Sequence, residues 1–460
     1  MASPLTTKVI DAIPEWALTF LANGLGSYYR LNRYSLDMRG TLSEWRTLEQ
    51  LNSEEIKVYQ LERLRHIAKV ANTTPYYSRV FREVGFDPYK INDLDDLNRL
   101  PYLSKDDLRQ FGSEMLVPNY KAAQVERKSS GTTGQPVRFT LPRRMAFAQA
   151  YAMLYQFYLW FGFSALDRRA TLAGRYMGQR PKGTVIRNVF ENQLLLGVHA
   201  LSESTVARYI TALNKFAPKM FQAHPSALLM LKQFAERIGQ SAPKIPLISY
   251  TGENMSENER QQLSKWLGKA MIFGTYGSGE NVMAASECPE LDGYHIHPAI
   301  GICELEEIDG KKEILGTSLL NDVMPMLRYR TGDLAENITA ETCACGLCWP
   351  RLQGIQGRLD DQITSANGDL IAPVVLRTGI AALGLISSAY SIIQHQAPGH
   401  FTLLVYDDRS AVPQNSIDRI LKYLRTTLGE SVEIGVRFVP REKLFTARAK
   451  HRIVIKEKVQ

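Results

Sequence analysis

Apolar residues recur at every third position in part of the first hundred residues. Within the segment 54–86 they stand at Val58, Leu61, Leu64, Ile67 and Val70, ahead of a run of turn formers at 72–75. This spacing is typical of one face of an amphipathic helix. We therefore expect a helical N-terminal region over about residues 1–110.

Short apolar runs alternate with helical patterns in the middle of the chain. The run 244–252 (KIPLISYTG) precedes the helical pattern 256–268, and a second apolar run, 269–277, follows it directly. A strand, a glycine turn and a helix that begins at a Ser or Asn cap are typical of an α/β layer. From Gly293 to Leu334 the pattern becomes rich in strand-like runs separated by turn signals. We therefore expect the α/β class.

The pattern changes again after the run 357–370 (GRLDDQITSANGDL). A strand-like run at 400–408, one amphipathic helical pattern at 416–429 and a basic end follow. We place a domain boundary near Asp360. The prediction is a large, multi-subdomain N-terminal domain over 1–358 and a small α+β C-terminal domain over 359–460.

Composition excludes several classes of protein. Hydrophobic residues make up 45% and charged residues 22% of the 460 residues, unlike a disordered chain, a collagen-like repeat or a coiled coil. Five Cys residues are too sparse for a disulfide scaffold, and the odd number fits a reducing compartment, so we expect the cytoplasm. The most apolar N-terminal stretch, 9–29, is interrupted by Asp11, Pro14 and Glu15. We expect neither a membrane span nor a secretory signal there.

The chain carries 55 Lys and Arg against 47 Asp and Glu, a net charge of +8. The segment 441–460 alone has seven basic and two acidic residues. A basic tail of this kind could hold a polyphosphate, RNA or an acidic surface. It could equally be an ordinary solvated C-terminus, so charge alone leaves both interpretations open.

The most informative run combines glycines with hydroxyl side chains: Ser129, Ser130, Gly131, Thr132, Thr133, Gly134, Gln135 and Pro136. Backbone N–H groups and hydroxyls in such a loop can cradle phosphate oxygens. The run lacks the Gly-Lys-Ser/Thr ending of a P-loop. Taken alone, it could also be a polar surface loop.

Further groups suited to a nucleotide follow in order. Tyr276 and Glu280, in YGSGE, offer an aromatic ring for a base and a carboxylate for Mg²⁺. Asp333, in YRTGDL, could accept both ribose hydroxyls, and Lys450 could reach an acyl phosphate. Arg358, in GRLDD, follows at the expected domain boundary. Simpler explanations are core packing for Tyr276, a turn for Asp333 and a surface charge for Arg358.

The order SSGTTG, YGSGE, YRTGDL, GRLDD and a terminal lysine resembles the adenylate-forming ligases. The segments TPYYSRVF, LPYLSKDDLR, HPSALLML and MPMLRYRTGDL resemble the phenylacetate–CoA ligase-like branch, which includes homologues from capsular-polysaccharide clusters. The resemblance runs from about residue 50 to the C-terminus. It implies ATP-dependent, AMP-forming activation of a carboxylic acid and transfer of the acyl group to a thiol, most often coenzyme A.

The resemblance also implies roles for individual residues. Those expected to bind ATP or AMP are Ser129, Ser130, Gly131, Thr132, Thr133, Gly134, Gly252, Glu253, Tyr276, Gly277, Asp333 and Arg358. Among them, Gly252 and Glu253 match the stretch that lines the adenine pocket in the family. Glu280 would bind Mg²⁺, Lys450 would stabilise the adenylation transition state, and Arg358 would contact ribose or phosphate, so these three are the expected catalytic residues. Asp360 matches the hinge about which the small domain rotates. Two departures are Gln135, where related ligases often carry lysine, and Ala449 before Lys450 in place of glycine.

Other functions remain open at this point. An amide-forming ligase or adenylyltransferase of polysaccharide or natural-product biosynthesis would use an amine acceptor in place of coenzyme A. A non-catalytic nucleotide- or RNA-binding module is a third alternative, against which the set Glu280, Asp333, Arg358 and Lys450 argues; we expect no nucleic-acid partner. An aryl acid fits the resemblance, whereas the particular acid and the oligomeric state, a homodimer included, are not readable from the sequence.

Cysteine and histidine positions suggest a metal site. Cys288 and His295 lie seven residues apart, and Cys343 and Cys345 follow about fifty residues later. Three thiolates and an imidazole would give closed tetrahedral zinc coordination, and such a set holds a structural zinc in some members of the branch. Free thiols near a loop are the alternative, and Cys348 could compete as a ligand. We expect His297 and Cys303 to be strand residues, and leave His224 open among acyl pocket, helix cap and core.

Overall fold

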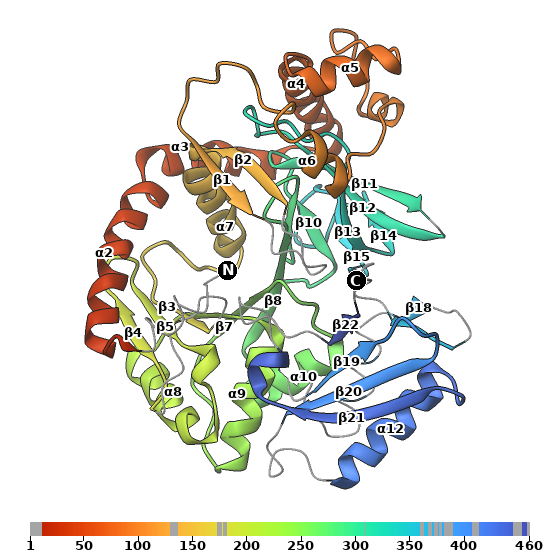
Figure 1. The fold of residues 1–460 in the computed structure, drawn as a ribbon. Coiled ribbons are helices and arrows are strands. Elements are labelled where there is room, and N and C mark those ends of the chain that lie inside the picture. The colour runs from red at the N-terminus through yellow and green to blue at the C-terminus, as the bar shows by residue number, and fades with distance from the viewer. Residues whose placement is uncertain are drawn as a thin grey trace. The chain divides into compact units, whose positions relative to one another are not determined.

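The computed structural model describes residues 12–128, 137–172, 177, 182–308, 310–358, 363–366, 370–371, 376, 380, 390–406, 414–444 and 453–457 (Figure 1). The chain forms two compact units. Unit 1 comprises Met1–Tyr28, Leu166–Ile272 and Gln356–Gln460, and unit 2 comprises Tyr29–Ala165 and Phe273–Ile355. Both units mix helices and strands, which confirms the predicted α/β class. The boundary near Asp360 stays a prediction, because residues 359–362 lie outside the described residues.

Helices occupy most of the first 111 residues: α2 (Glu15–Arg33), α3 (Leu36–Thr47), α4 (Ser53–Asn72), α5 (Pro75–Glu83) and α6 (Lys105–Phe111). Helix α4 begins at a capping box, in which the backbone N–H of Glu55 donates to the side chain of Asn52 and that of Asn52 donates to Glu55. Leu64 and Ile67 of the predicted apolar face are buried, whereas Val58 is exposed. Residues spaced by three do not stay on one side of a helix with 3.6 residues per turn. The first and last positions of the pattern therefore lie away from the buried face.

Unit 2 is built on two sets of strands. One set has the order β14 (Asn337–Thr339), β15 (Arg351–Gln353), β10 (Tyr294–Ile296), β9 (Ala284–Ser286) and β8 (Met271–Gly277). The other is an antiparallel sheet of β11 (Gly301–Ile308), β12 (Lys311–Ser318) and β13 (Tyr329–Leu334), in the stretch predicted to be rich in strands. Helix α7 (Ala150–Leu159) and the hairpin of β1 (Gln124–Lys128) and β2 (Arg138–Pro142) complete the unit. The predicted phosphate-binding run connects β1 and β2.

In unit 1 a sheet has the strand order β7 (Leu247–Thr251), β6 (Met220–Ala223), β3 (Arg169–Leu172), β5 (Gln193–Leu196) and β4 (Val185–Asn188). The first four strands run parallel, and β4 is antiparallel to β5. Helices α8 (Glu203–Phe216), α9 (Pro225–Arg237) and α10 (Glu257–Trp266) bury apolar side chains in one core with this sheet. The predicted strand, helix and strand over 244–277 are confirmed as β7, α10 and β8, and Ser256 caps α10 as expected.

The C-terminal part of unit 1 has a second sheet and its own core. The strand order is β21 (Glu433–Val439), β20 (His400–Tyr406), β19 (Tyr390–Gln394) and β22 (Val454–Lys456), with a small hairpin of β17 (Ile363–Thr364) and β18 (Leu370–Ile371). Helix α12 (Gln414–Leu428) lies along one face of this sheet (Figure 1). Ile417 and Leu424 of α12 pack with Ile392 and Leu403 in a separate hydrophobic cluster. Among the described helices, none is both long and apolar enough to cross a membrane.

Candidate nucleotide site and metal centre

Strand β13 brings Asp333 against Tyr276 at the end of β8. The hydroxyl of Tyr276 donates a hydrogen bond to Oδ2 of Asp333 at 2.8 Å. Burial of the hydroxyl, followed by the negative charge of Asp333, raises the pKa of Tyr276 well above its ordinary value. The phenol therefore stays protonated and acts as a donor. Two residues that the sequence predicts at adenine and ribose thus lie in direct contact.

A buried carboxylate fixes the turn that presents Asp333. Glu313 of β12 is 1% exposed. Its Oε2 accepts hydrogen bonds from Nη2 and Nε of Arg330 at 2.6 and 3.0 Å, and its Oε1 accepts one from the backbone N–H of Gly332 at 3.0 Å. Gly332 has φ +77°, which favours glycine, and a Cβ there would lie 3.1 Å from Nζ of Lys105. Sequence reasoning did not single out Glu313 or Lys105.

The same strand also reaches Glu280. The carboxylate of Glu280 is buried, and its Oε1 accepts a hydrogen bond from the hydroxyl of Tyr329 at 3.2 Å. Tyr329 begins β13, the strand that ends just after Asp333. The two ends of one strand thus hold the two predicted ligands of unit 2, Glu280 for Mg²⁺ and Asp333 for ribose.

Gly252 and Glu253 form the turn after β7 in unit 1. Gly252 has φ +77°. The carboxylate of Glu253 accepts hydrogen bonds from the backbone N–H and the hydroxyl of Ser226, both at 3.0 Å. Ser226 lies in the first turn of α9, where a negative charge is favoured by the exposed N–H groups of the helix. Glu253 therefore ties the predicted adenine-pocket turn to the start of α9.

His224 is the residue that precedes α9, and its side chain is buried. Its Nδ1 lies 2.7 Å from the carbonyl oxygen of Thr251, to which it donates a hydrogen bond. The imidazole thus links the start of α9 to the end of β7 and does not cap the helix through its side chain. A contribution to the acyl pocket stays a prediction.

Several predicted residues lie outside this geometry. The loop Ser129, Ser130, Gly131, Thr132, Thr133 and Gly134, together with Asp360 and Lys450, lies outside the described residues. Arg358 ends the short strand β16 (Gly357–Arg358), of which the backbone is described. Gly277 ends β8, immediately after Tyr276.

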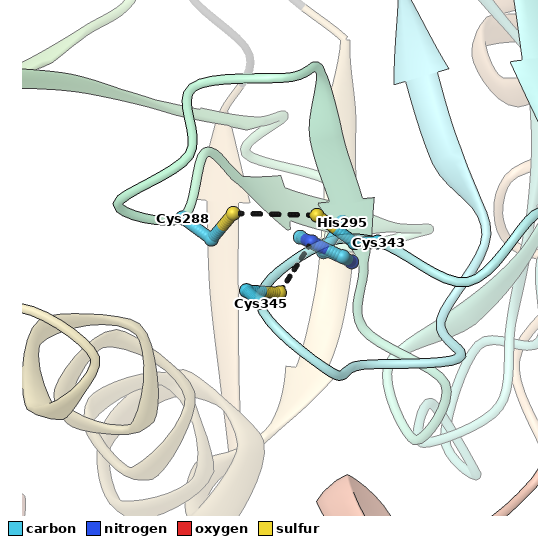
Figure 2. Close-up of side chains that lie close together, drawn as sticks. All are labelled: Cys288, His295, Cys343 and Cys345. Carbon is cyan, nitrogen blue, oxygen red and sulfur yellow. Dashed lines mark hydrogen bonds between the residues drawn. The ribbon is translucent and has the colours of Figure 1, made fainter.

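Four side chains that could hold a metal ion lie close together in unit 2 (Figure 2). Sγ of Cys288 lies 3.8 Å from Sγ of Cys343, and Sγ of Cys345 lies 3.4 Å from Nε2 of His295. All four ligand atoms lie within 4.8 Å of one another. The structure therefore brings together the four residues predicted as a zinc site.

The strand set that contains β9, β10, β14 and β15 positions these four residues. Cys288 follows β9, His295 lies in β10, and Cys343 and Cys345 lie in the connection between β14 and β15. Strand β10 pairs with both β9 and β15, with His295 opposite Ser286 and Arg351. The connection turns back tightly, since the N–H of Gly346 donates to the carbonyl of Cys343 at 2.9 Å. Segments distant in sequence thereby converge.

The imidazole of His295 is oriented for metal binding. Its Nδ1 donates to the carbonyl oxygen of Trp349 at 3.2 Å, which leaves the Nε2 lone pair toward Cys345. Burial lowers the pKa of His295 to about 4. The ring is therefore neutral near pH 7, which is the form that a metal requires.

The neighbouring candidates lie outside this group. Sγ of Cys348 lies 3.6 Å from the hydroxyl of Thr342. Cys303 lies in β11, where burial raises the pKa of its thiol. Nε2 of His297 donates to the side-chain oxygen of Gln156 at 2.9 Å, and Nδ1 accepts from the N–H of Ala299. Burial lowers the pKa of His297 to about 3.

Comparisons of the chain with known proteins show the family to which it belongs. No family model matches the chain. Phenylacetate–coenzyme A ligase of Thermus thermophilus is 30% identical over 380 residues, which cover 75% of this chain and 80% of the relative. Protein CapK of Staphylococcus aureus is 21% identical over 381 residues, 80% of this chain and 82% of CapK. A crystal structure of 2-hydroxyisobutyryl-CoA ligase with a bound acyl adenylate has a TM-score of 0.67 at 19% identity, over 89% of this chain and 91% of that one. By its similarity to the Thermus enzyme, the chain belongs to the phenylacetate–CoA ligase family of adenylate-forming enzymes.

Proposed function

We propose that the chain activates a carboxylic acid as its AMP ester, at the expense of ATP, and passes the acyl group to coenzyme A. The observation that carries this function is the similarity to phenylacetate–CoA ligase over 75% of the chain. The contact of Tyr276 with Asp333 agrees with it, because it joins an aromatic ring suited to a base and a carboxylate suited to a ribose.

In the first half-reaction, a carboxylate oxygen attacks the α-phosphorus of ATP, and the bond to the bridging oxygen of pyrophosphate breaks. Asp333 would accept hydrogen bonds from the ribose hydroxyls while Tyr276 holds its other side. Lys450 and Arg358 would offset the negative charge that builds up during the attack. In the second half-reaction, the thiol sulfur attacks the acyl carbon, its proton passes to solvent, and AMP leaves.

Glu280 is suited to hold Mg²⁺. Its carboxylate is buried and accepts from the neutral hydroxyl of Tyr329, and none of the ion pairs among the described residues includes it. A buried carboxylate is costly unless it is paired or binds a metal. Mg²⁺ bound here would neutralise charge on the phosphates of ATP.

The four residues Cys288, His295, Cys343 and Cys345 fit a structural zinc. Tetrahedral coordination with Zn–S bonds of about 2.3 Å places two sulfur atoms about 3.8 Å apart. The separation of Cys288 and Cys343 is 3.8 Å. Four protein ligands leave no position for a substrate, so the metal would join the β9–β10 and β14–β15 connections and take no part in the reaction.

The C-terminal segment would act as the mobile domain, rotating about Asp360 between the two half-reactions. Its support is the separate hydrophobic cluster that β19, β20 and α12 form around Ile392 and Leu424. A segment with its own core can move as a body. Rotation would withdraw Lys450 after adenylation and admit the thiol.

ATP–pyrophosphate exchange across aryl, aliphatic and amino acids tests this function. We expect the wild type to exchange pyrophosphate with one class of acid. Lys450→Ala and Glu280→Gln should lose this exchange. Glu307→Gln, at an exposed residue of β11, is the control and should keep it. Coenzyme A, added next, should give a thioester and release AMP. Product formed only with an amine would support the amide-forming alternative, and failure to bind ATP would refute adenylation altogether.

A further inference from the structure

Helix α2 turns its polar side toward the protein and its apolar side outward. The side chain of Asn23 donates to the carbonyl of Arg187 at 2.8 Å and accepts from the N–H of Val189 at 2.9 Å. Arg208 makes an ion pair with Glu15 at 2.6 Å. Gly26 is buried so closely against Asn188 that a Cβ could not be added without displacing that side chain. These contacts fix which face of α2 looks outward.

The outward face of α2 carries large apolar side chains and no charge. Trp16 and Phe20 are 75% and 77% exposed, and the other exposed members of this face within unit 1 are Leu21, Leu25 and Tyr28. In a helix of 3.6 residues per turn these positions fall within one half of the circumference. Val189 and Phe190, in the turn that Asn23 holds, are also exposed. We call these seven residues the α2 patch.

The area of the α2 patch matches a protein interface. With about 150–250 Å² for each aromatic side chain, the patch exposes on the order of 700 Å² of apolar surface. Exposed patches on monomeric proteins rarely exceed roughly 300–600 Å². Two such patches would together bury about 1,400 Å², within the roughly 1,200–2,000 Å² of stable interfaces.

Gly24 lies at the centre of this face. Phe20 and Tyr28 stand one turn before and one turn after it, and a Cβ at Gly24 would meet nothing within 4 Å. A glycine in an exposed helix is destabilising relative to alanine. That cost is offset where a second helix crosses at the glycine, because the two backbones can approach closely. The aromatic ring on either side of Gly24 makes the face nearly self-complementary about a two-fold axis.

We propose that the α2 patch is the interface of a two-fold homodimer, in which the α2 helices of two copies cross at Gly24. A membrane surface fits less well. Helices that lie on membranes carry many basic residues beside the apolar face, whereas α2 has Arg30, Arg33 and Glu15 as its charged residues. Arg30 and Arg33 lie over the rings of Tyr34 and Tyr29. The glycine would also add nothing to membrane insertion.

Sedimentation velocity of the full chain at micromolar concentrations tests the proposal. The wild type should sediment as a dimer. Phe20→Asp and Gly24→Leu should each raise the dimer dissociation constant at least about tenfold. Val58→Asp, at an exposed apolar residue of α4, should leave it unchanged. Gly24→Leu is the sharper variant, since leucine has the higher helix propensity and a Cβ at this position meets nothing within 4 Å, so the subunit should keep its fold.

Three results would overturn the proposal. The first is a monomeric wild type. The second is a dimer that neither Phe20→Asp nor Gly24→Leu weakens, which would place the interface elsewhere. The third is binding to vesicles of phosphatidylglycerol and phosphatidylcholine that Gly24→Leu strengthens and Phe20→Asp abolishes, which would assign the α2 patch to a membrane surface.

Discussion

The hydroxyl of Tyr276 donates a hydrogen bond to the carboxylate of Asp333, 57 residues further along the chain, at 2.8 Å. One partner offers a ring and the other a carboxylate, so each can contact a different part of a nucleoside. Because burial and the charge of Asp333 keep the phenol protonated, the bond persists through the neutral pH range.

Tyr276→Phe isolates the contribution of this hydrogen bond. The ring is retained and Asp333 loses a donor, so the carboxylate is less firmly oriented toward ribose. We expect the KM for ATP to rise about three- to tenfold, as for a bond of roughly 1 kcal/mol, with a smaller change in kcat. Tyr276→Ala should have a larger effect, because stacking is lost as well. Steady-state kinetics at varied ATP measures both; an unchanged KM in Tyr276→Phe would show that the hydroxyl does not orient Asp333.

Glu313→Ala should lower both stability and ATP affinity. It removes the carboxylate that holds Arg330 and the N–H of Gly332. Truncating one member of a buried ion pair costs about 3–5 kcal/mol, and partial exposure of Arg330 reduces this to about 2 kcal/mol. Urea denaturation measures the loss. Glu307→Ala, on the exposed side of β11, is the control, and equal losses in the two variants would contradict the assigned role of Glu313.

The local pattern predicted elements better than it predicted contacts. The β7, α10 and β8 order was readable because period, turn and cap all lie within about thirty residues. The role of Glu313 was not readable, because its partners lie on another strand. Glu253 was expected at adenine from resemblance, and its bonds to Ser226 depend on how β7 packs beside α9.

The apolar stretch at the N-terminus shows the same limit. The sequence excluded a membrane span there, because acidic residues and a proline interrupt the run. It could not show that Asn23 and Gly26 face inward while Trp16 and Phe20 face outward. That orientation depends on the contacts of Asn23 with Arg187 and Val189.

Zinc content should depend on the four clustered residues and not on Cys348. Elemental analysis should find one zinc per chain in the wild type and in Cys348→Ser. Cys343→Ser and Cys345→Ser should lose most of the metal, and chelation should destabilise the wild type, because a structural metal contributes to folding. Zinc retained in Cys345→Ser and lost in Cys348→Ser would show that Cys348 is the ligand in its place.

Because His297 is buried as a neutral ring, it should lower the free energy of unfolding as the pH falls below neutrality. Its pKa is about 3 in the folded chain, against an ordinary value of 6.5, because the ring is buried. Below pH 6.5 the unfolded state binds a proton that the folded state does not bind until about pH 3, so stability falls with pH over this window. Between pH 7 and 5 the loss from one such histidine is about 2 kcal/mol. Urea denaturation at several pH values measures this loss in the wild type and in His297→Gln, where the slope should be smaller. An identical slope in the variant would mean that His297 is not the group that takes up the proton.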